Sequence, residues 1–163
     1  MTKYKLYLRL KANVINHPKI FYNKLKKQKW LKFKKYKAQH LSEYSSIIMA
    51  KQRLRAFYGN ISEKQIRCLY RKAKYFSGIT AINFIQLIES RLDTVLFRLR
   101  FANTFEEIKQ YITHKHILVN KQVVSSPSFL LKEGDIISIH KNSFSFISKK
   151  ILISFKLFLN KTE

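Results

Sequence analysis

The first 40 residues of the chain contain 13 lysine and arginine residues and no aspartate or glutamate, and the first carboxylate belongs to Glu43. A block of one charge sign repels itself, so it becomes compact only against a polyanion. Aromatic residues occur throughout the same block: Tyr4, Tyr7, Phe21, Tyr22, Trp30, Phe33 and Tyr36. Because aromatic rings stack on exposed bases, this pattern favours RNA over a lipid surface. A solvated, disordered basic tail is the alternative interpretation.

The remainder of the chain has the composition of a folded protein. The net charge of the whole chain is +24, yet 46% of its residues are apolar, which is ordinary for a globular domain. Residues 41–140 are closer to neutral, with 15 basic and 8 acidic residues, whereas residues 141–163 have five basic residues and one acidic residue. We therefore expect the core to form within residues 41–140 and the two ends to form arms.

Several kinds of site are not expected. The single cysteine, Cys68, excludes an intramolecular disulfide and a multi-cysteine zinc site, and its apolar neighbours predict a buried side chain. No uninterrupted apolar run reaches the roughly 18 residues that a membrane span requires. The N-terminus also lacks the apolar segment of a secretory signal. We expect no metal, no cofactor, no membrane and no small-molecule substrate.

Residue usage indicates the coding genome. Phe, Tyr, Met, Ile, Asn and Lys together account for 77 residues, whereas Gly, Ala, Arg and Pro account for only 20. Lysine outnumbers arginine by 25 to 8, although arginine is the better ligand for phosphate. The favoured residues have AT-rich codons, so we infer an AT-rich genome such as that of an organelle. The mitochondrion is the first choice and the plastid the second.

From Ser42 onward the apolar residues follow a helical period. The first predicted helix has one apolar face and ends at Gly59-Asn60; the face comprises Ile47, Ala50, Leu54 and Phe57. The second begins after Ser62, which forms a capping box with Gln65, and ends before Gly78. Its apolar stripe comprises Ile66, Leu69, Tyr70 and Ala73.

The second predicted helix also has a basic stripe. It comprises Lys64, Arg67, Arg71 and Lys74, spaced by three, four and three residues. Such a stripe is often only a solvated face. Here no acidic partner at i,i+4 is expected among the four cations, so we interpret the stripe as a surface that contacts phosphates.

A third helix is predicted from about Ala81 through Arg100, and a short fourth helix follows the capping pair Asn103-Thr104. Beyond it the apolar period changes to two. Short strands are expected over 117–119, 122–124 and 135–139, with Asn120-Lys121 as a tight turn. The apolar runs within 144–158 are expected to form a strand pair or a strand and a tail.

These residues carry a family resemblance. The segment from Arg91 to Ile139 closely resembles the S4 RNA-binding module: RLDTVLFRLRFANTFEEIKQYITHKHILVNKQVVSSPSFLLKEGDIISI. Two preceding segments, LRAFYGNISEKQIRCLYRKAK (54–74) and NFIQLIESRLD (83–93), resemble the helical domain of the small-subunit ribosomal protein S4 family. The Lys-rich opening is similar to the mitochondrially encoded branch of that family.

The resemblance implies an α+β fold in four parts. Residues 1–40 are a basic, irregular N-terminal arm, and residues 41–90 a small helical rRNA-binding domain. Residues 91–140 are an S4-type module of two helices and a small curled antiparallel sheet, and residues 141–163 a C-terminal strand or tail.

The implied function is that of a non-enzymatic constituent of the small ribosomal subunit. It would bind the 5′ domain of the small-subunit rRNA and lie beside neighbouring proteins such as ribosomal protein S5. Carried over residue by residue, the RNA-facing set of the module is Arg91, Arg98, Lys109, Gln110, Thr113, His114, Lys115, Asn120 and Lys121. The other candidates are Lys51 and Arg55 in the first predicted helix and the four cations of the basic stripe. Arg91 has an alternative role in an ion pair with Glu89 or Asp93.

The chain departs from the family pattern at three positions. Phe105 stands where the family usually has arginine, and Lys109 replaces another arginine, exchanging a planar fork for a point charge. The hairpin turn, usually Asn-Gly, is Asn120-Lys121 here. Because lysine disfavours positive φ, we expect either a different turn or a turn held by rRNA.

Two other functions are found among proteins with an S4-type module. An S4-module enzyme that modifies RNA or charges tRNA would need a catalytic domain larger than the remaining residues provide, and a catalytic aspartate in a pocket. A ribosome-associated rescue or biogenesis factor with an S4 module would not need the helical domain of 54–74. That segment therefore favours the ribosomal constituent.

Overall fold

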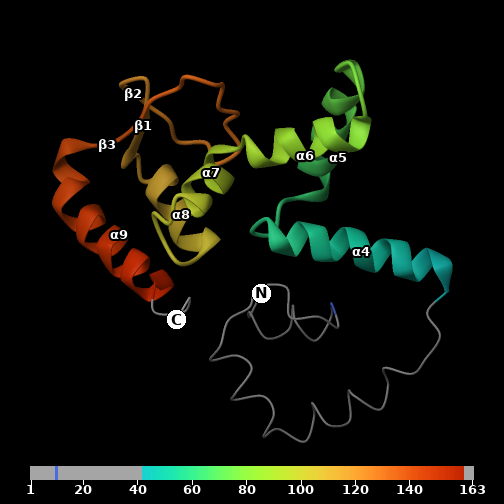
Figure 1. Cartoon of the computed structure of the whole chain (residues 1–163), viewed down its shortest axis with the longest axis horizontal. Helices are drawn as coiled ribbons and strands as arrows, with labels where there is room; N and C mark the ends of the chain where they lie inside the picture. Colours follow the sequence, from blue (N-terminus) through green and yellow to red (C-terminus); the bar gives the residue numbers. More distant parts are fainter. Residues whose placement is uncertain (1–9, 11–41, 160–163) are drawn as a thin grey trace, which may run out of the picture. The chain divides into compact units, whose positions relative to one another are not determined.

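The computed structural model describes Leu10 and residues 42–159 of the chain (Figure 1). Apart from Leu10, the predicted N-terminal arm lies outside the described residues, as do residues 160–163. The chain divides into two compact units, Met1–Ser62 and Glu63–Glu163. This division falls within the segment 41–90 that was predicted as one helical domain, so its first helix is described separately.

The first unit contains α4 (Glu43–Phe57). The Ser42 hydroxyl accepts a hydrogen bond from the Ser45 amide at 3.3 Å, which satisfies one of the free amides at the start of the helix. Gly59 and Asn60 have φ values of 69° and 60°, a left-handed conformation that ends the helix where the sequence predicted.

Much of the predicted apolar face of α4 is exposed. Ile47 is 67% exposed, Phe57 is 45% exposed, and the buried residue of the helix is Ala56. A helical period identifies an apolar face but does not supply the neighbour that covers it.

The second unit begins with a helical hairpin of α5 (Glu63–Tyr75) and α6 (Thr80–Glu89), which lie side by side (Figure 1). The start and end of α5 agree with the prediction. Gly78, at φ 97°, lies in the turn between the helices. The Asn83 side chain donates to the carbonyls of Phe76 at 3.2 Å and Ser77 at 3.1 Å, so α6 fixes the end of α5.

The predicted third helix is broken in two. After α6, residue Arg91 is extended, with φ −68° and ψ 141°, and α7 covers Leu92–Arg98. The Leu92 amide donates to the Phe129 carbonyl at 2.8 Å, and the Leu131 amide donates to the Ser90 carbonyl at 2.9 Å. The continuous helix was wrong because a segment about 40 residues later in the chain pairs with the backbone at this point.

Arg91 and Asp93 form a buried ion pair at the same break. Arg91 Nε lies 2.9 Å from Asp93 Oδ1, and a second guanidinium nitrogen lies 2.7 Å from Oδ2. The two side chains are only 3% and 0% exposed. The geometry is bidentate, the strongest arrangement for an arginine and a carboxylate.

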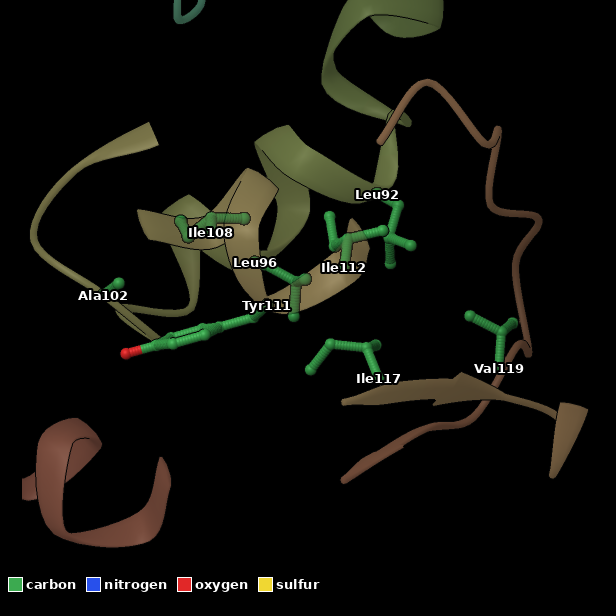
Figure 2. Close-up of a cluster of buried hydrophobic side chains, with 8 residues drawn as sticks. All are labelled: Leu92, Leu96, Ala102, Ile108, Tyr111, Ile112, Ile117 and Val119. Atoms are coloured by element: carbon green, nitrogen blue, oxygen red, sulfur yellow. The ribbon is translucent and has the colours of Figure 1, made fainter. Parts of the chain in front are cut away.

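The rest of the unit confirms the predicted α+β module. Helices α7 and α8 (Phe105–Thr113) pack on an antiparallel sheet of β1 (Ile117–Val119), β2 (Gln122–Val123) and β3 (Ile137–Ile139), in the order β2-β1-β3. Leu118 is paired with Val123 on one side and with Ser138 on the other. One apolar cluster fills the space between helices and sheet (Figure 2): Leu92, Leu96, Ala102, Ile108, Tyr111, Ile112, Ile117 and Val119.

Residues 144–159 form a helix. A short 3₁₀ turn, η2 (Lys141–Ser143), leads into α9 (Phe144–Leu159), so the expected C-terminal strand or tail was wrong. The Ile147 side chain is fully buried. One helical turn later, Lys150 Nζ lies 2.6 Å from Glu107 Oε1 on α8. The lysine that interrupts the apolar runs therefore lies on the docking side of a helix.

The pKa values of Glu107, Tyr111 and Lys150 are all shifted where α8 meets α9. Burial alone would raise the pKa of Glu107, but hydrogen bonds from Lys150 and Tyr111 and the Lys150 charge outweigh burial and lower it. Burial and the hydrogen bond to Glu107 raise the pKa of Tyr111 to about 12. At neutral pH Glu107 is thus an ionised acceptor for both neighbours.

We predict that Asp93→Asn destabilises the chain by about 3–5 kcal/mol, because it leaves the Arg91 charge buried without its partner. Glu89→Gln is the matched control. It breaks the partly exposed pair of Glu89 with Arg98 and should change the free energy of unfolding by less than about 1 kcal/mol. Chemical denaturation monitored by circular dichroism measures both, and equal effects would contradict the assignment.

We also predict that acid weakens the docking of α9. A carboxyl group whose pKa is lowered by folding stabilises the fold above its unfolded pKa and loses that contribution as the pH falls through the folded value. The unfolding temperature of the wild type should therefore exceed that of Glu107→Gln at pH 7, and the difference should vanish well below pH 4.5, the ordinary value for this group. Glu106→Gln removes a carboxylate from the same helical turn and serves as control. A difference that persists at acid pH would refute the prediction.

Candidate nucleic-acid interface

The basic stripe of α5 lies on the surface, as predicted. Ile66, Leu69 and Ala73 are buried on one side of the helix. All four cations of the stripe, Lys64, Arg67, Arg71 and Lys74, are exposed. Lys72 is also exposed, but its position in the helical period places it on the opposite flank. The helix therefore presents a row of positive charge along one side.

One inference about the stripe requires correction. Arg67 has an acidic partner one turn earlier, since its guanidinium lies 3.2 Å from Glu63 Oε1. The Arg67 side chain is 71% exposed, and exposed pairs at this spacing contribute little. The pair therefore leaves the positive potential of the stripe largely intact. Lys74 Nζ lies over the Tyr70 ring, 5.2 Å from its centroid.

The two candidate RNA-binding residues on α4, Lys51 and Arg55, are partly buried. Arg55 donates from Nε to the Ile61 carbonyl at 2.8 Å and from a terminal nitrogen to Gln52 Oε1 at 3.0 Å. These bonds tie the end of α4 to the following loop, so Arg55 has a structural role within its unit. Lys51 is likewise partly buried.

Arg91 is not at the surface. Its burial and its bidentate pair with Asp93 correct the expectation that it faces RNA, and favour the ion-pair alternative. Arg98 is about half exposed and pairs with Glu89, with Nε 3.1 Å from Oε2 and a terminal nitrogen 2.6 Å from Oε1. Both guanidinium groups are held in bidentate pairs with a carboxylate, and both are therefore less available to a phosphate than the exposed cations of α5.

Exposed polar groups gather at the end of α8. Gln110, Thr113, His114 and Lys115 are exposed, and Lys115 has a φ of 63°. The Thr113 hydroxyl donates to the Lys109 carbonyl at 2.7 Å, so its oxygen remains able to accept a bond. Lys109 is half-buried, and burial lowers its pKa, an effect that Asp93 opposes and Arg91 reinforces.

The hairpin turn between β1 and β2 presents the last two candidates. Asn120 and Lys121 are both exposed, with φ values of 51° and 65°. Positive φ at both central residues is the mark of a type I′ turn. The tight turn is therefore confirmed, and the lysine adopts the conformation that the sequence analysis considered unfavourable.

Three features of this surface differ from what the sequence patterns predict. Arg100 follows α7 at a φ of 60°, with its guanidinium carbon 6.0 Å from the centroid of the Phe97 ring. Lys150 lies at the contact of α8 with α9. This role follows only if residues 144–158 are helical, whereas the sequence predicted a strand there. Cys68 is exposed and not buried as expected, because it lies next to the apolar stripe of α5 and not within it.

Within residues 42–159, no three His, Cys, Asp or Glu side chains are arranged to hold a metal ion. None of the helices in that range combines the length and the apolar content that crossing a bilayer requires. What the described residues do provide is exposed cations and hydrogen-bonding groups on α5, at the end of α8 and at the β1–β2 turn. Such groups bind phosphate oxygens and sugar hydroxyls.

Comparison with known proteins gives two family matches. The family described as the ribosomal protein S4/S9 N-terminal domain matches residues 2–89, and the S4 domain matches residues 90–137. The junction of the two matches lies next to the break between α6 and α7.

Curated relatives carry the name small ribosomal subunit protein uS4. The protein from Gluconobacter oxydans is 48% identical over 105 residues, which is 64% of this chain and 51% of the relative. Those from Parvibaculum lavamentivorans and Paramagnetospirillum magneticum are 39% and 42% identical over 142 and 141 residues, each covering 68% of the relative. The matched part of the chain thus spans about half to two-thirds of the length of these relatives.

We predict that Arg71→Glu weakens binding to small-subunit rRNA roughly tenfold at moderate salt, because it reverses one charge within the basic stripe that is predicted to contact phosphates. Lys74→Glu should act in the same way. Lys72→Glu makes the same change of net charge on the opposite flank of α5, and Lys161→Glu makes it near the end of the chain. Filter binding measures all four, and equal losses would refute the assignment of the stripe.

Proposed function

Because the chain belongs to the ribosomal protein S4 family, we propose that it is a structural constituent of the small ribosomal subunit and binds small-subunit rRNA. The observation that carries this proposal is the exposed cationic side of α5, which lies in the helical hairpin that precedes an S4 domain in the same chain. An S4 domain alone occurs in several kinds of RNA-binding protein. The match of residues 2–89 to the S4/S9 N-terminal domain favours the ribosomal one.

Binding would proceed by charge neutralisation and shape recognition. The cations of the basic stripe of α5, at the end of α8 and at the β1–β2 turn contact phosphates and release condensed counterions. Polar side chains such as Gln110, Thr113 and Asn120 then contact sugars and bases at close range. No bond is made or broken in this role, which is therefore not enzymatic.

The rRNA target proposed is the 5′ domain, and protein neighbours such as S5 are proposed partners. The exposed side of α6 supports a protein neighbour. Ile79, Ile82 and Ile85 are each more than half exposed, and residues 75–88 contain no charged side chain. A surface of this kind does not neutralise phosphate and is better suited to contact an apolar protein surface.

A mitochondrial location is proposed from residue usage, with the plastid as second choice. The low content of Gly, Ala, Arg and Pro and the excess of lysine over arginine support an AT-rich organellar genome. The second candidate function is a ribosome-associated rescue or biogenesis factor with an S4 module. The S4 domain match over residues 90–137 is common to both functions.

We predict that the full chain binds a transcript of the small-subunit rRNA 5′ domain with a strong dependence on salt. If about 8 to 12 phosphates are contacted, log K against log salt should have a slope between about −6 and −11. In the cell, the chain should sediment with small subunits and with their assembly intermediates.

Two results would contradict the proposal. One is a slope near zero, which would mean that phosphates contribute little to binding. The other is a chain that sediments only with stalled ribosomal subunits and is absent from assembly intermediates and from translating ribosomes, which would favour the rescue factor. An unrelated transcript of equal length controls for binding that depends on charge alone.

A further inference from the structure

The turn between β1 and β2 holds a lysine in a conformation that favours glycine. Lys121 occupies the second central position of the type I′ turn at a φ of 65°. In this region the Cβ atom crowds the backbone carbonyl, which is why glycine is preferred there. A side chain at this position lowers the stability of the hairpin unless its interactions offset the strain.

The turn is braced by the segment that leads into β3. Asn120 Nδ2 donates to Asp135 Oδ1 at 2.8 Å, and Asn120 Oδ1 accepts from the Ile136 amide at 2.9 Å. The Asn120 amide donates to the Ile136 carbonyl at 2.9 Å, and Asp135 Oδ2 accepts from the Lys132 amide at 2.8 Å. The backbone bond from Lys132 and the bond from Asn120 lower the pKa of Asp135, so this carboxylate is ionised at neutral pH. The brace uses Asn120 and does not involve the Lys121 side chain.

Nothing within the described part of the chain offsets the strain at Lys121. Its side chain is exposed and makes no hydrogen bond or ion pair with any residue of 42–159. The other cations at positive φ differ in this respect. Arg100 and Lys115 follow the ends of α7 and α8, where the helix dipole favours positive charge. Lys121 follows a strand and has no such dipole.

We propose that Lys121 is a preorganised contact to an rRNA phosphate, and that Asn120 and Asp135 are the positioning residues that hold it in place. This inference rests on the proposed function. A lysine on a braced turn loses less backbone freedom on binding than one on an unsupported loop, so more of its charge interaction contributes to affinity. Strain in the free protein is then compensated only in the complex.

The test compares Lys121→Gly and Lys121→Asn in the full chain, with a transcript of the rRNA 5′ domain as probe. Both residues tolerate positive φ and lack the charge. Lys121→Gly should raise the unfolding temperature by about 4 °C, and Lys121→Asn by less. Both should weaken binding roughly fivefold and make the salt slope shallower by about 0.7 to 0.9, the contribution of one phosphate. Lys72→Asn removes one charge elsewhere and should leave the slope unchanged.

Asp135→Ala tests the positioning role, because positioning and net charge predict opposite changes in the affinity for RNA. The substitution makes the chain more positive, so a role of net charge alone would strengthen RNA binding. Positioning requires the opposite, a weaker complex, because the turn loses its brace while Lys121 is still present. Tighter binding by Asp135→Ala would overturn the positioning role.

The possible failures can be distinguished. If the Lys121 variants are more stable but bind RNA like the wild type, the lysine reflects codon usage alone and the inference is overturned. In that case weak binding by Arg71→Glu would still support the proposed function. If the wild type itself binds the transcript without a salt slope, the proposed function fails, and the inference fails with it.

Discussion

The buried pair of Arg91 and Asp93 is the interaction on which the second unit depends. It lies where the helical hairpin ends and the S4 module begins, and the adjacent backbone pairs with residues 129–131. A guanidinium without its carboxylate at this position would be a desolvated, unpaired charge. The pair therefore requires α6, α7 and the loop before β3 to meet at one point. The core between helices and sheet is assembled around that junction.

The cations of this chain serve two separate purposes. Arg91, Arg98 and Lys150 are held by carboxylates. The pairs of Arg98 with Glu89 and of Lys150 with Glu107 link different helices, whereas Arg91 and Asp93 pair locally at the start of α7. Lys64, Arg71 and the lysines at the ends of α8 and β1 project from the surface instead. A chain with so few acidic residues has few ion pairs to distribute, so most of its positive charge remains available to a polyanion.

The same residue types were assigned different roles by the structure. Arg71 and Arg91 are both predicted RNA ligands, Arg71 from the basic stripe and Arg91 from the family resemblance. Arg71 lies on the exposed side of α5, whereas Arg91 lies inside the protein because Asp93 and the paired loop enclose it. Lys121 is the converse case. The sequence identified its turn, but only the structure showed that the turn is left-handed and braced by Asp135.

Local patterns in the sequence determined the extent of α5, the end of α4, the three short strands and the class of partner, because caps, apolar periods and charge runs act between near neighbours. Tertiary structure decided the break between α6 and α7, the helical state of residues 144–159 and the burial of Arg91. Each of these depends on a contact with a distant segment. The break and the burial of Arg91 depend on the pairing with residues 129–131, and the helix α9 docks through Glu107. A period in the chain specifies which side chains share a face, and only the packed neighbour specifies what that face meets.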